Sequence, residues 1–253
     1  MNTTPRPAPP APNSQARTAH ALTLPIVIAM DGPSASGKGT LSRRLAKELG
    51  YTYVDSGAMY RTLAWYCLQK QVPMPAKAAA LTPATEKPIV SLLRRWKAEL
   101  KVLDGAIWLH VDGYFPKDEI RTDPVEKAVP IIAQIGKVRD WMVARQRDCV
   151  QFGPLVMEGR DIGTEVFPLA PVKFFLDANP AARAARMQER GSLACTERDK
   201  LDMNRKQGAL IPALDAIRID NTGHTVDETF ALMQAHLQSR LGAGQPGKGG
   251  KTS

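Results

Sequence analysis

The first patterned stretch of the chain is an apolar run at residues 22–30, which ends in an acidic residue and a glycine. Because the run is short, partly β-branched and closed by these two residues, it predicts a buried strand rather than a signal peptide or a membrane span. Apolar residues then return at helical spacing, as Leu41, Leu45 and Leu49 before Gly50. The pattern therefore predicts a strand, a loop and a helix that ends at a glycine cap.

The alternation of strand and helix patterns continues toward the C-terminus. Residues 53–55 predict a second short strand that runs into a turn and a helix, and residues 137–147 have a helical pattern. The runs LVMEG at 155–159 and VKFFLDA at 172–178 are short and apolar, as expected for strands buried on both faces. Together these segments predict an α/β fold of three α/β/α layers with a central parallel sheet.

Residues 71–122 interrupt this alternation. The segment 73–88 is rich in Pro and Ala and predicts little order, residues 91–100 have a helical pattern, and residues 102–113 form a pair of strand patterns around glycines. We interpret the region as an insertion into the α/β domain.

The two ends of the chain differ in composition from its middle. Residues 1–21 are rich in Pro and Ala and lack acidic residues, and residues 243–253 are rich in Gly. Neither segment has enough apolar surface to form a core, so we expect both to be disordered and the folded domain to span residues 22–242. A transit peptide is the alternative for the first segment, although its prolines oppose the amphipathic helix of such peptides.

The cysteine content bears on the compartment in which the protein works. Cys67, Cys149 and Cys195 are odd in number and too far apart for a disulfide framework or a zinc site. We expect them to pack as small apolar residues in a protein of the reducing cytoplasm.

The formal net charge is +9, and the arginines that contribute to it are unevenly distributed. Nine arginines lie between Arg139 and Arg205, interleaved with acidic residues that include Asp161, Asp199 and Asp202. Such alternation favours a cleft for a small polyanion, whereas nucleic-acid binding favours basic stretches with aromatic residues among them. We therefore expect small anionic ligands, no nucleic-acid partner and no membrane partner.

The segment GPSASGKGT at residues 32–40 is the strongest chemical motif of the chain. Gly32 and Gly37 allow the backbone to curl so that its N–H groups and the start of the next helix face a phosphate, while Lys38 adds a positive charge. We expect Lys38 to lie in a surface loop. A glycine-rich turn without a ligand is the alternative, which the strand before it and the helix after it make the weaker one.

One position of this motif departs from the usual phosphate-binding loop. Gly39 stands where a serine or threonine normally offers a hydroxyl to Mg²⁺, and Thr40 follows one step further into the helix. We expect Mg²⁺ to depend more on phosphates and water, with Thr40 in an indirect or weak role.

Polar residues also follow the predicted strands directly. Asp55 ends the second strand pattern, and Glu158, Gly159, Arg160 and Asp161 end the run that begins at residue 155. Ligands of open α/β sheets bind beyond the carboxyl ends of the strands, so these residues are predicted to lie at the ligand site. A turn with a local ion pair is the alternative for the Gly-Arg-Asp triplet.

Two predicted helices carry arginines on one face. The first begins at an Asn-Pro cap at residues 179–180 and runs to Gly191. The face of this helix consists of Arg183, Arg186 and Arg190, and the face of the second helix consists of Arg198, Asp202 and Arg205. The alternative interpretation of both faces is a solvated surface, on which each Arg–Asp pair contributes a few tenths of a kcal/mol.

Eight segments together carry a family resemblance. They are GPSASGKGT (32–40), YVDSGAMYR (53–61), EIRT (119–122), KVRDWMVARQR (137–147), LVMEGRDIGTEVFP (155–168), VKFFLDAN (172–179), ERDKLDMNR (197–205) and IRIDNTG (217–223). In this order and spacing the chain resembles the bacterial-type cytidylate kinases over roughly residues 24–240. The resemblance implies a P-loop NTPase-type fold with a nucleoside-monophosphate-binding insertion at about residues 71–125 and a helical lid at about residues 180–207.

The same resemblance implies transfer of a phosphoryl group from ATP, bound with Mg²⁺, to CMP and dCMP by a monomer. The catalytic residues implied are Lys38, Arg160 and Arg205. Those implied to bind ATP are Gly32, Pro33, Ser34, Ala35, Ser36, Gly37, Lys38, Gly39, Thr40 and Arg186. Those implied to bind CMP are Ser56, together with Arg61, Arg160 and Arg205 at the phosphate, Arg139 and Asp161 at the base, and Arg198 and Asp202 at the sugar.

Two departures from the family pattern leave details open. Pro130 stands where relatives often offer a serine to the base, and it has neither a hydroxyl nor an N–H. The segment between Arg190 and Arg198 is also shorter than in relatives, which leaves open the arginine that covers the adenine or the transferring phosphoryl. Two other classes stay alternatives, a P-loop kinase of another small acceptor and a nucleic-acid-dependent P-loop ATPase.

Overall fold

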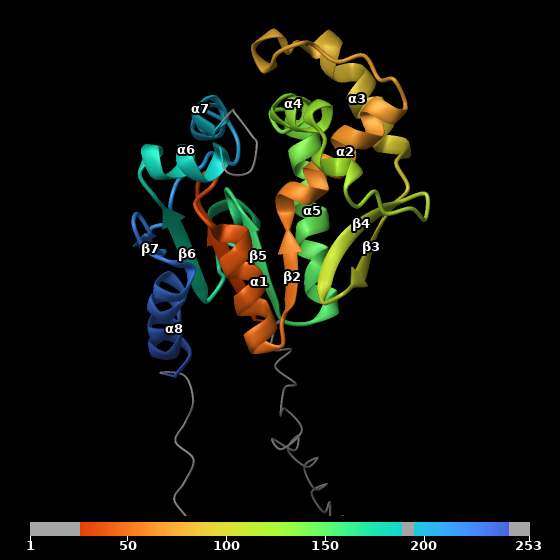
Figure 1. Ribbon diagram of the computed structural model, residues 1–253. Helices are drawn as coiled ribbons and strands as arrows, with labels where there is room; N and C mark the ends of the chain where they lie inside the picture. The colour runs from red at the N-terminus through yellow and green to blue at the C-terminus, as the bar shows by residue number, and fades with distance from the viewer. Residues whose placement is uncertain (1–25, 189–194, 243–253) are drawn as a thin grey trace, which may run out of the picture.

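A computed structural model of the protein describes residues 26–188 and 195–242, which form a sheet between two layers of helices (Figure 1). The seven strands lie in the order β3-β4-β2-β5-β1-β6-β7, and every neighbouring pair is parallel except β3 and β4. The strands are β1 (Val27–Asp31), β2 (Thr52–Asp55), β3 (Ala98–Leu103), β4 (Ala106–Val111), β5 (Leu155–Gly159), β6 (Val172–Asp177) and β7 (Ile217–Asp220).

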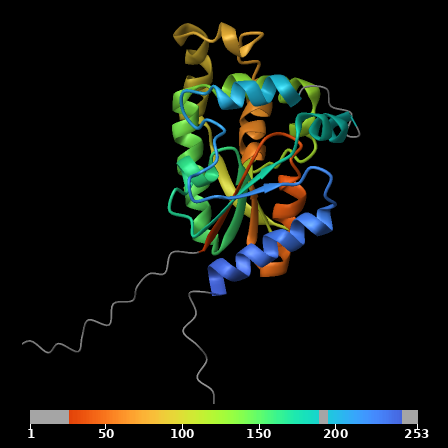
Figure 2. The ribbon, with the colours of Figure 1, turned by 90° about the vertical axis from the view of Figure 1, so that its left-hand side faces the viewer.

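Helices cover both faces of the sheet (Figure 2). One layer contains α1 (Lys38–Leu49) and α8 (Val226–Gly242), and the other contains α2 (Ser56–Gln69), α3 (Pro83–Arg95), α4 (Asp123–Ile132) and α5 (Gly136–Asp148). Helices α6 (Pro180–Gln188) and α7 (Cys195–Met203) lie at the side toward which the carboxyl ends of β2 and β6 point (Figure 1). Across the described ranges, the helices are too short or too polar to span a membrane.

The central strand β1 shows why its sequence is apolar at successive positions. All five of its residues are buried, and their side chains alternate between the two faces of the sheet. Val27 and Ala29 pack into the core beneath α2 and α5, whereas Ile28 and Met30 pack into the core beneath α1 and α8. A strand that contacts helices on both faces therefore needs an unbroken apolar run.

The predicted three-layer fold is confirmed, with one difference at the edge of the sheet. The strand, loop and helix predicted around residues 22–50 correspond to β1 and α1, and α1 ends at Gly50 in a left-handed conformation. The predicted strand pair in residues 102–113 forms β3 and β4, joined at Asp104 and Gly105. Because β3 runs antiparallel to β4, the sheet is mostly rather than wholly parallel.

The prediction was wrong about where the helix before β3 lies. Helix α3 begins at Pro83, inside the segment predicted to have little order, because the side chains of Thr82 and Thr85 cap its N-terminus reciprocally. It ends at Arg95, so residues 98–100 belong to β3 rather than to the predicted helix. Pairing of β3 with β4 has overridden the helical pattern there.

The region interpreted as an insertion joins the central sheet. Strand β4 pairs in parallel with β2, with Tyr53 opposite Ala106 and Val54 opposite Ile107. The predicted disordered ends at 1–21 and 243–253, and the predicted end of the first arginine-bearing helix at Gly191, lie outside the described residues.

Phe174 provides a test of the core. Its side chain is 1% exposed on β6, and truncation of such a side chain costs about 3–5 kcal/mol. We expect Phe174→Ala to lower the free energy of unfolding by this amount in urea titrations. Leu169→Ala is the control, since Leu169 is 94% exposed and should change it by less than about 0.5 kcal/mol. Equal losses from both variants would contradict the described packing.

Candidate active site

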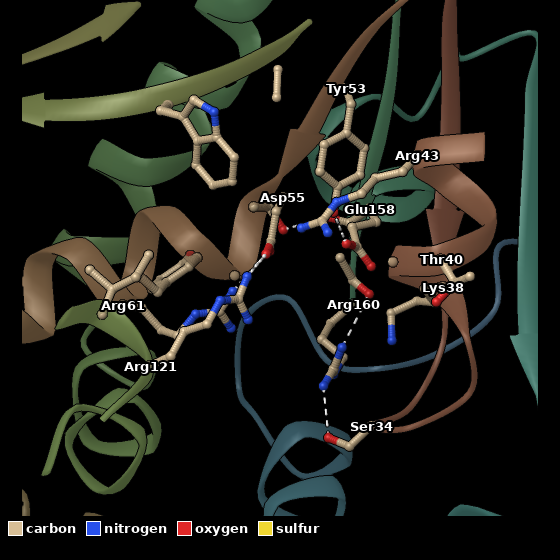
Figure 3. Close-up of a pocket in the computed structure, with 18 of the residues that line it drawn as sticks. Ser34, Lys38, Thr40, Arg43, Tyr53, Asp55, Arg61, Arg121, Glu158 and Arg160 are labelled. Atoms are coloured by element: carbon tan, nitrogen blue, oxygen red, sulfur yellow. Dashed lines mark hydrogen bonds and ion pairs between the residues drawn. The ribbon is translucent and has the colours of Figure 1, made fainter. Parts of the chain in front are cut away.

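A cleft of about 1400 Å³ opens at the carboxyl ends of β1, β2 and β5 (Figure 3). Its walls come from the phosphate-loop segment, the start of α2, the region after β4, helices α4 and α5, and α7. Predicted site residues that line it are Ser34–Thr40, Ser56, Arg61, Arg139, Arg160, Asp161, Asp202 and Arg205. Residues from widely separated segments therefore face one space.

The loop at residues 32–37 follows a path that most side chains would block. A Cβ atom at Gly32 would lie 2.0 Å from the carbonyl oxygen of Leu176, so β6 approaches the backbone at this point. Gly37 has φ +90°, in the region that favours glycine, and it directly precedes α1. The curled backbone thus brings the positive N-terminal end of α1 to the cleft.

Lys38 is buried at the start of α1, so the expectation of an exposed loop residue was wrong. Its Nζ donates to the carbonyl oxygen of Pro33 at 2.7 Å. Burial, together with the nearby Arg160 guanidinium, lowers the pKa of Lys38 to about 7, against the opposing effect of Glu158 and other carboxylates. A phosphate would replace the carbonyl as a stronger partner for the ammonium group and raise this pKa.

Glu158 occupies the space next to the unusual glycine of the loop. A Cβ atom at Gly39 would lie 3.0 Å from Oε1 of Glu158, and the same oxygen accepts a hydrogen bond from the hydroxyl of Tyr53. Burial and the neighbouring Asp55 raise the pKa of Glu158. At the position where other phosphate-binding loops offer a hydroxyl, this loop therefore has a carboxylate close by. Thr40, for which a weak or indirect role toward Mg²⁺ was predicted, is exposed on the first turn of α1.

Asp55 organises the cationic side of the cleft near α2. Its carboxylate caps α2 by accepting from the N–H of Ala58 at 2.9 Å and forms an ion pair with Arg61 at 2.6 Å. Arg121 lies 3.6 Å from the same carboxylate. Burial acts to raise the pKa of Asp55, but the arginines and the cap hold it below its ordinary value. The hydroxyl of Ser56 donates to the carbonyl of Glu158 at 2.7 Å, so it joins the ends of β2 and β5.

Arg139 and Asp161 form a buried ion pair at the far end of the cleft. Burial raises the pKa of Asp161, and Arg139 opposes this shift. The sequence analysis missed Gly208, whose φ is +62° and whose added Cβ would lie 1.7 Å from Nη2 of Arg139. The glycine lets the chain after α7 pass directly over the pair.

Arg160 and Arg205 share one carboxylate. Nε of Arg160 lies 2.8 Å from Oδ2 of Asp202, and Arg205 pairs with Oδ1 of the same residue. Asp202 is 1% exposed, so this cluster differs from the solvated surface pairs that were the alternative for the arginine faces. The predicted residues Arg160, Asp202 and Arg205 therefore form a single group.

Arg186 is held near the loop by a residue that received no predicted role. It donates to Oδ1 of Asn221 at 3.0 Å and to the carbonyl of Ala35 at 3.3 Å, and Asn221 donates to the carbonyl of Ser36 at 2.7 Å. The position of Asn221 directly after β7 was the available signal, since ligand sites lie at strand ends. The side chains of Arg190 and Arg198 lie outside the described residues.

Asp31 ties the end of β1 to the loop that follows β5. Its two oxygens accept from the N–H groups of Ile162 at 2.8 Å and Gly163 at 2.7 Å. Burial raises the pKa of Asp31 from 3.8 to about 6, although these two bonds and Lys38 act in the opposite direction and Asp161 adds to the rise. The bonds fix the backbone that directly follows Arg160 and Asp161.

Comparison with known proteins shows the family of the chain. Residues 28–239 match the family model described as cytidylate kinase. The chain belongs to the cytidylate kinase family. Among curated relatives, the cytidylate kinase of Enterococcus faecalis is 38% identical over 227 residues, which cover 85% of this chain and 96% of that protein. That of Geobacillus kaustophilus is 39% identical over 229 residues, which cover 86% and 98% of the two chains.

Membership of the cytidylate kinase family makes this protein a phosphotransferase. Pro130 is the residue whose role the resemblance left open. Pro130 lies inside α4, whereas its neighbours Val129 and Ala133 line the cleft. The cleft wall at this point is therefore apolar.

The buried Asp31 gives a pH test of this site. The folded state binds the proton of Asp31 more tightly than the unfolded chain does, so the contribution of Asp31 to the free energy of unfolding falls as pH rises from about 4 to about 6. The shift corresponds to about 3 kcal/mol. Asp31→Asn lacks this titration. The free energy of unfolding of the wild type minus that of the variant should therefore decline over this pH range. Urea unfolding at several pH values measures the difference. A constant difference would contradict the raised pKa.

Proposed function

We propose that the protein transfers the γ-phosphoryl group of ATP to CMP, and to dCMP, as a kinase of pyrimidine nucleotide metabolism. The observation that carries the proposal is one cleft that joins the phosphate loop of a cytidylate kinase family member to four arginines that are held by carboxylates. These arginines are Arg61, Arg139, Arg160 and Arg205. The loop supplies the donor site, and the arginines supply the acceptor site.

Phosphoryl transfer of this kind depends on position and charge. Lys38 would contact the β and γ phosphates of ATP, while Arg160 and Arg205 would neutralise the oxygens of the transferring group. Arg61 would hold the phosphate of CMP on the opposite side. The attacking phosphate of CMP is already an anion, so the reaction requires no general base. Arg186 would bind the ATP side, because it lies against the loop carbonyl of Ala35.

Mg²⁺ is the proposed companion of ATP. Among residues 26–188 and 195–242, no three His, Cys, Asp or Glu side chains cluster as a preformed metal site. The carboxylate of Glu158 beside Gly39 is nevertheless a hard oxygen donor next to the loop, and it fits a cation that is bound mostly through phosphates and water. Glu158 and, less directly, Thr40 would face it. When bound, Mg²⁺ supplies neutralisation of the phosphate oxygens.

The Arg139–Asp161 pair would select the base. A carboxylate accepts a hydrogen bond from the exocyclic amine of cytosine, whereas uracil presents a carbonyl at the same place and is repelled. Arg139 would fix the ring and keep Asp161 ionised, against the burial that raises the pKa of this carboxyl. Asp202, and Arg198 by family resemblance, would bind the sugar.

The proposal includes the oligomeric state of the protein, the compartment in which it acts and the segments that close over the substrates. The protein would act as a monomer. Cys67 and Cys149 are free and buried, as expected in the reducing cytoplasm, where ATP is available. Residues 71–125 would form the acceptor-binding arm and residues 180–207 the lid that excludes water during transfer.

A coupled assay of ADP formation with each nucleoside monophosphate tests the function. CMP and dCMP should be the best acceptors. Transfer to a sugar but not to CMP would support a kinase of another acceptor. ATP hydrolysis that rises with RNA or DNA and ignores CMP would support a nucleic-acid-dependent ATPase instead.

Removal of the positive side chains that would contact the phosphates should severely reduce or abolish phosphoryl transfer. We expect Arg160→Ala to lower kcat by about a thousandfold, the scale of a lost phosphate-neutralising arginine, and Lys38→Ala to leave transfer undetectable. Steady-state kinetics measure the effect, and circular dichroism checks the fold. Arg44→Ala is a matched control, since Arg44 pairs with Asp227 on the surface. Near-normal activity of folded Lys38→Ala would refute the assignment of the loop.

The base-recognition proposal predicts a change in specificity. Asp161→Ala should reduce kcat/KM for CMP by about tenfold to a hundredfold more than for UMP, because an unpaired buried polar group costs about 1–3 kcal/mol. Asp140→Ala serves as the control, since this neighbouring carboxylate on α5 contacts Gln207 on the surface. Equal losses for both substrates would mean that Asp161 only orients Arg139.

A further inference from the structure

Three separate segments meet at Ser34 in the phosphate loop. Its backbone N–H donates to Oδ1 of Asp199 at 3.0 Å, its carbonyl accepts from Arg183 at 3.3 Å, and its hydroxyl accepts from Arg160 at 2.9 Å. Arg160 follows β5, Arg183 lies on α6 and Asp199 lies on α7. Figure 3 shows the contact of Ser34 with Arg160. One loop residue is thus fixed through its N–H, its carbonyl and its hydroxyl.

Asp199 connects two of these contacts. Its Oδ2 pairs with Arg183, whose Nε donates to the carbonyl of Ala178 at 3.0 Å, just after β6. Asp199 is 3% exposed and Arg183 is 7% exposed. Neither residue lines the cleft that holds the predicted substrate contacts. Asp199 therefore acts on the cleft through the residues that it contacts, and its charge also opposes the lowering of the pKa of Lys38.

The neighbouring carboxylate of α7 shows what Asp199 is placed to do. Asp202, three residues later and so on the same face of the helix, holds Nε of Arg160 at 2.8 Å. Nη2 of Arg160 is held by Ser34, and the N–H of Ser34 is held by Asp199. The two carboxylates of one helix face thus fix the same guanidinium from two sides, one directly and the other through the phosphate loop.

We propose that Asp199 is a positioning residue, which fixes Ser34 and thereby the distance between the phosphate loop and Arg160. The proposal rests on the proposed function, in which the loop holds ATP and Arg160 neutralises the transferring group. A shift of Ser34 would move the donor phosphates and release Arg160 at the same time. Asp199 would then affect the use of ATP more than the use of CMP.

The competing explanation is that Asp199 only joins α7 to α6 through its ion pair with Arg183. Two substitutions separate the explanations. Asp199→Asn keeps an oxygen that can accept from the N–H of Ser34 but removes the charge opposite Arg183, whereas Asp199→Ala removes both. A purely structural ion pair predicts equal effects of the two variants on activity.

The experiment measures kcat, KM for ATP and CMP, affinity for a non-hydrolysable ATP analogue, and the midpoint of thermal unfolding. We expect Asp199→Ala to lower kcat/KM for ATP about tenfold to a hundredfold, and Asp199→Asn to stay within about threefold of wild type. Both variants should lower the unfolding temperature. Asp215→Asn is the matched control, because it removes the carboxylate partner of Lys173, which is 6% exposed and outside the cleft. It should lower the unfolding temperature without changing kcat/KM.

Equal losses of kcat/KM in the Asn and Ala variants would overturn the proposal, as would an Ala variant whose activity falls no further than that of Asp215→Asn. If Asp199→Ala does not fold, Ser34→Ala replaces it. This variant removes the hydroxyl that accepts from Arg160, so we expect a lower kcat at an unchanged unfolding temperature, and an unchanged kcat would overturn the proposal. Wild-type protein that binds the ATP analogue but does not phosphorylate CMP would refute the proposed function. The role of Asp199 would still be decided by the affinities of the variants for the analogue.

Discussion

Pairing of four cleft arginines with carboxylates is the constraint on which the site depends. A guanidinium taken out of water is tolerated in a protein only when a counter-charge and hydrogen bonds compensate it. Asp55 does this for Arg61, Asp161 for Arg139, and Asp202 for both Arg160 and Arg205. The cleft can therefore hold several positive charges at fixed positions before any phosphate arrives.

The same pairing makes the site preorganised. Stabilisation of charge is most effective when the donors are already oriented, because little reorganisation then occurs during the reaction. The carboxylates come from the end of β2, from the loop after β5 and from α7, so each fixes its arginine from a different part of the fold. Their own positions depend on the sheet, since Asp55 caps α2 and Asp31 anchors the loop that carries Asp161. The chemistry of the cleft thus follows from how the ends of the strands are joined.

The sequence was sufficient to predict the layers of the fold and the phosphate loop of the cleft, because both have local signals. Buried strands require apolar runs, and a phosphate loop requires glycines at fixed spacing. Contacts between distant segments leave no such signal. Gly208 is needed only because its backbone passes over Arg139, and Asn221 acts only because α6 brings Arg186 beside it. The pairing of side chains across helices was equally unpredictable. Arg183 and Asp199 each lie on a helix that the sequence predicts, but no local pattern indicates that they form an ion pair.

The strand at one edge of the sheet has a consequence for the behaviour of the protein at high concentration. An edge strand exposes unpaired backbone groups that can recruit a strand from another molecule, and charged side chains oppose this. Strand β3 forms that edge, and it carries Glu99 and Lys101 as an exposed ion pair at 3.1 Å. An incoming strand would have to desolvate both charges. The hairpin that extends the wall of the cleft thereby also opposes the addition of a further strand at this edge of the sheet.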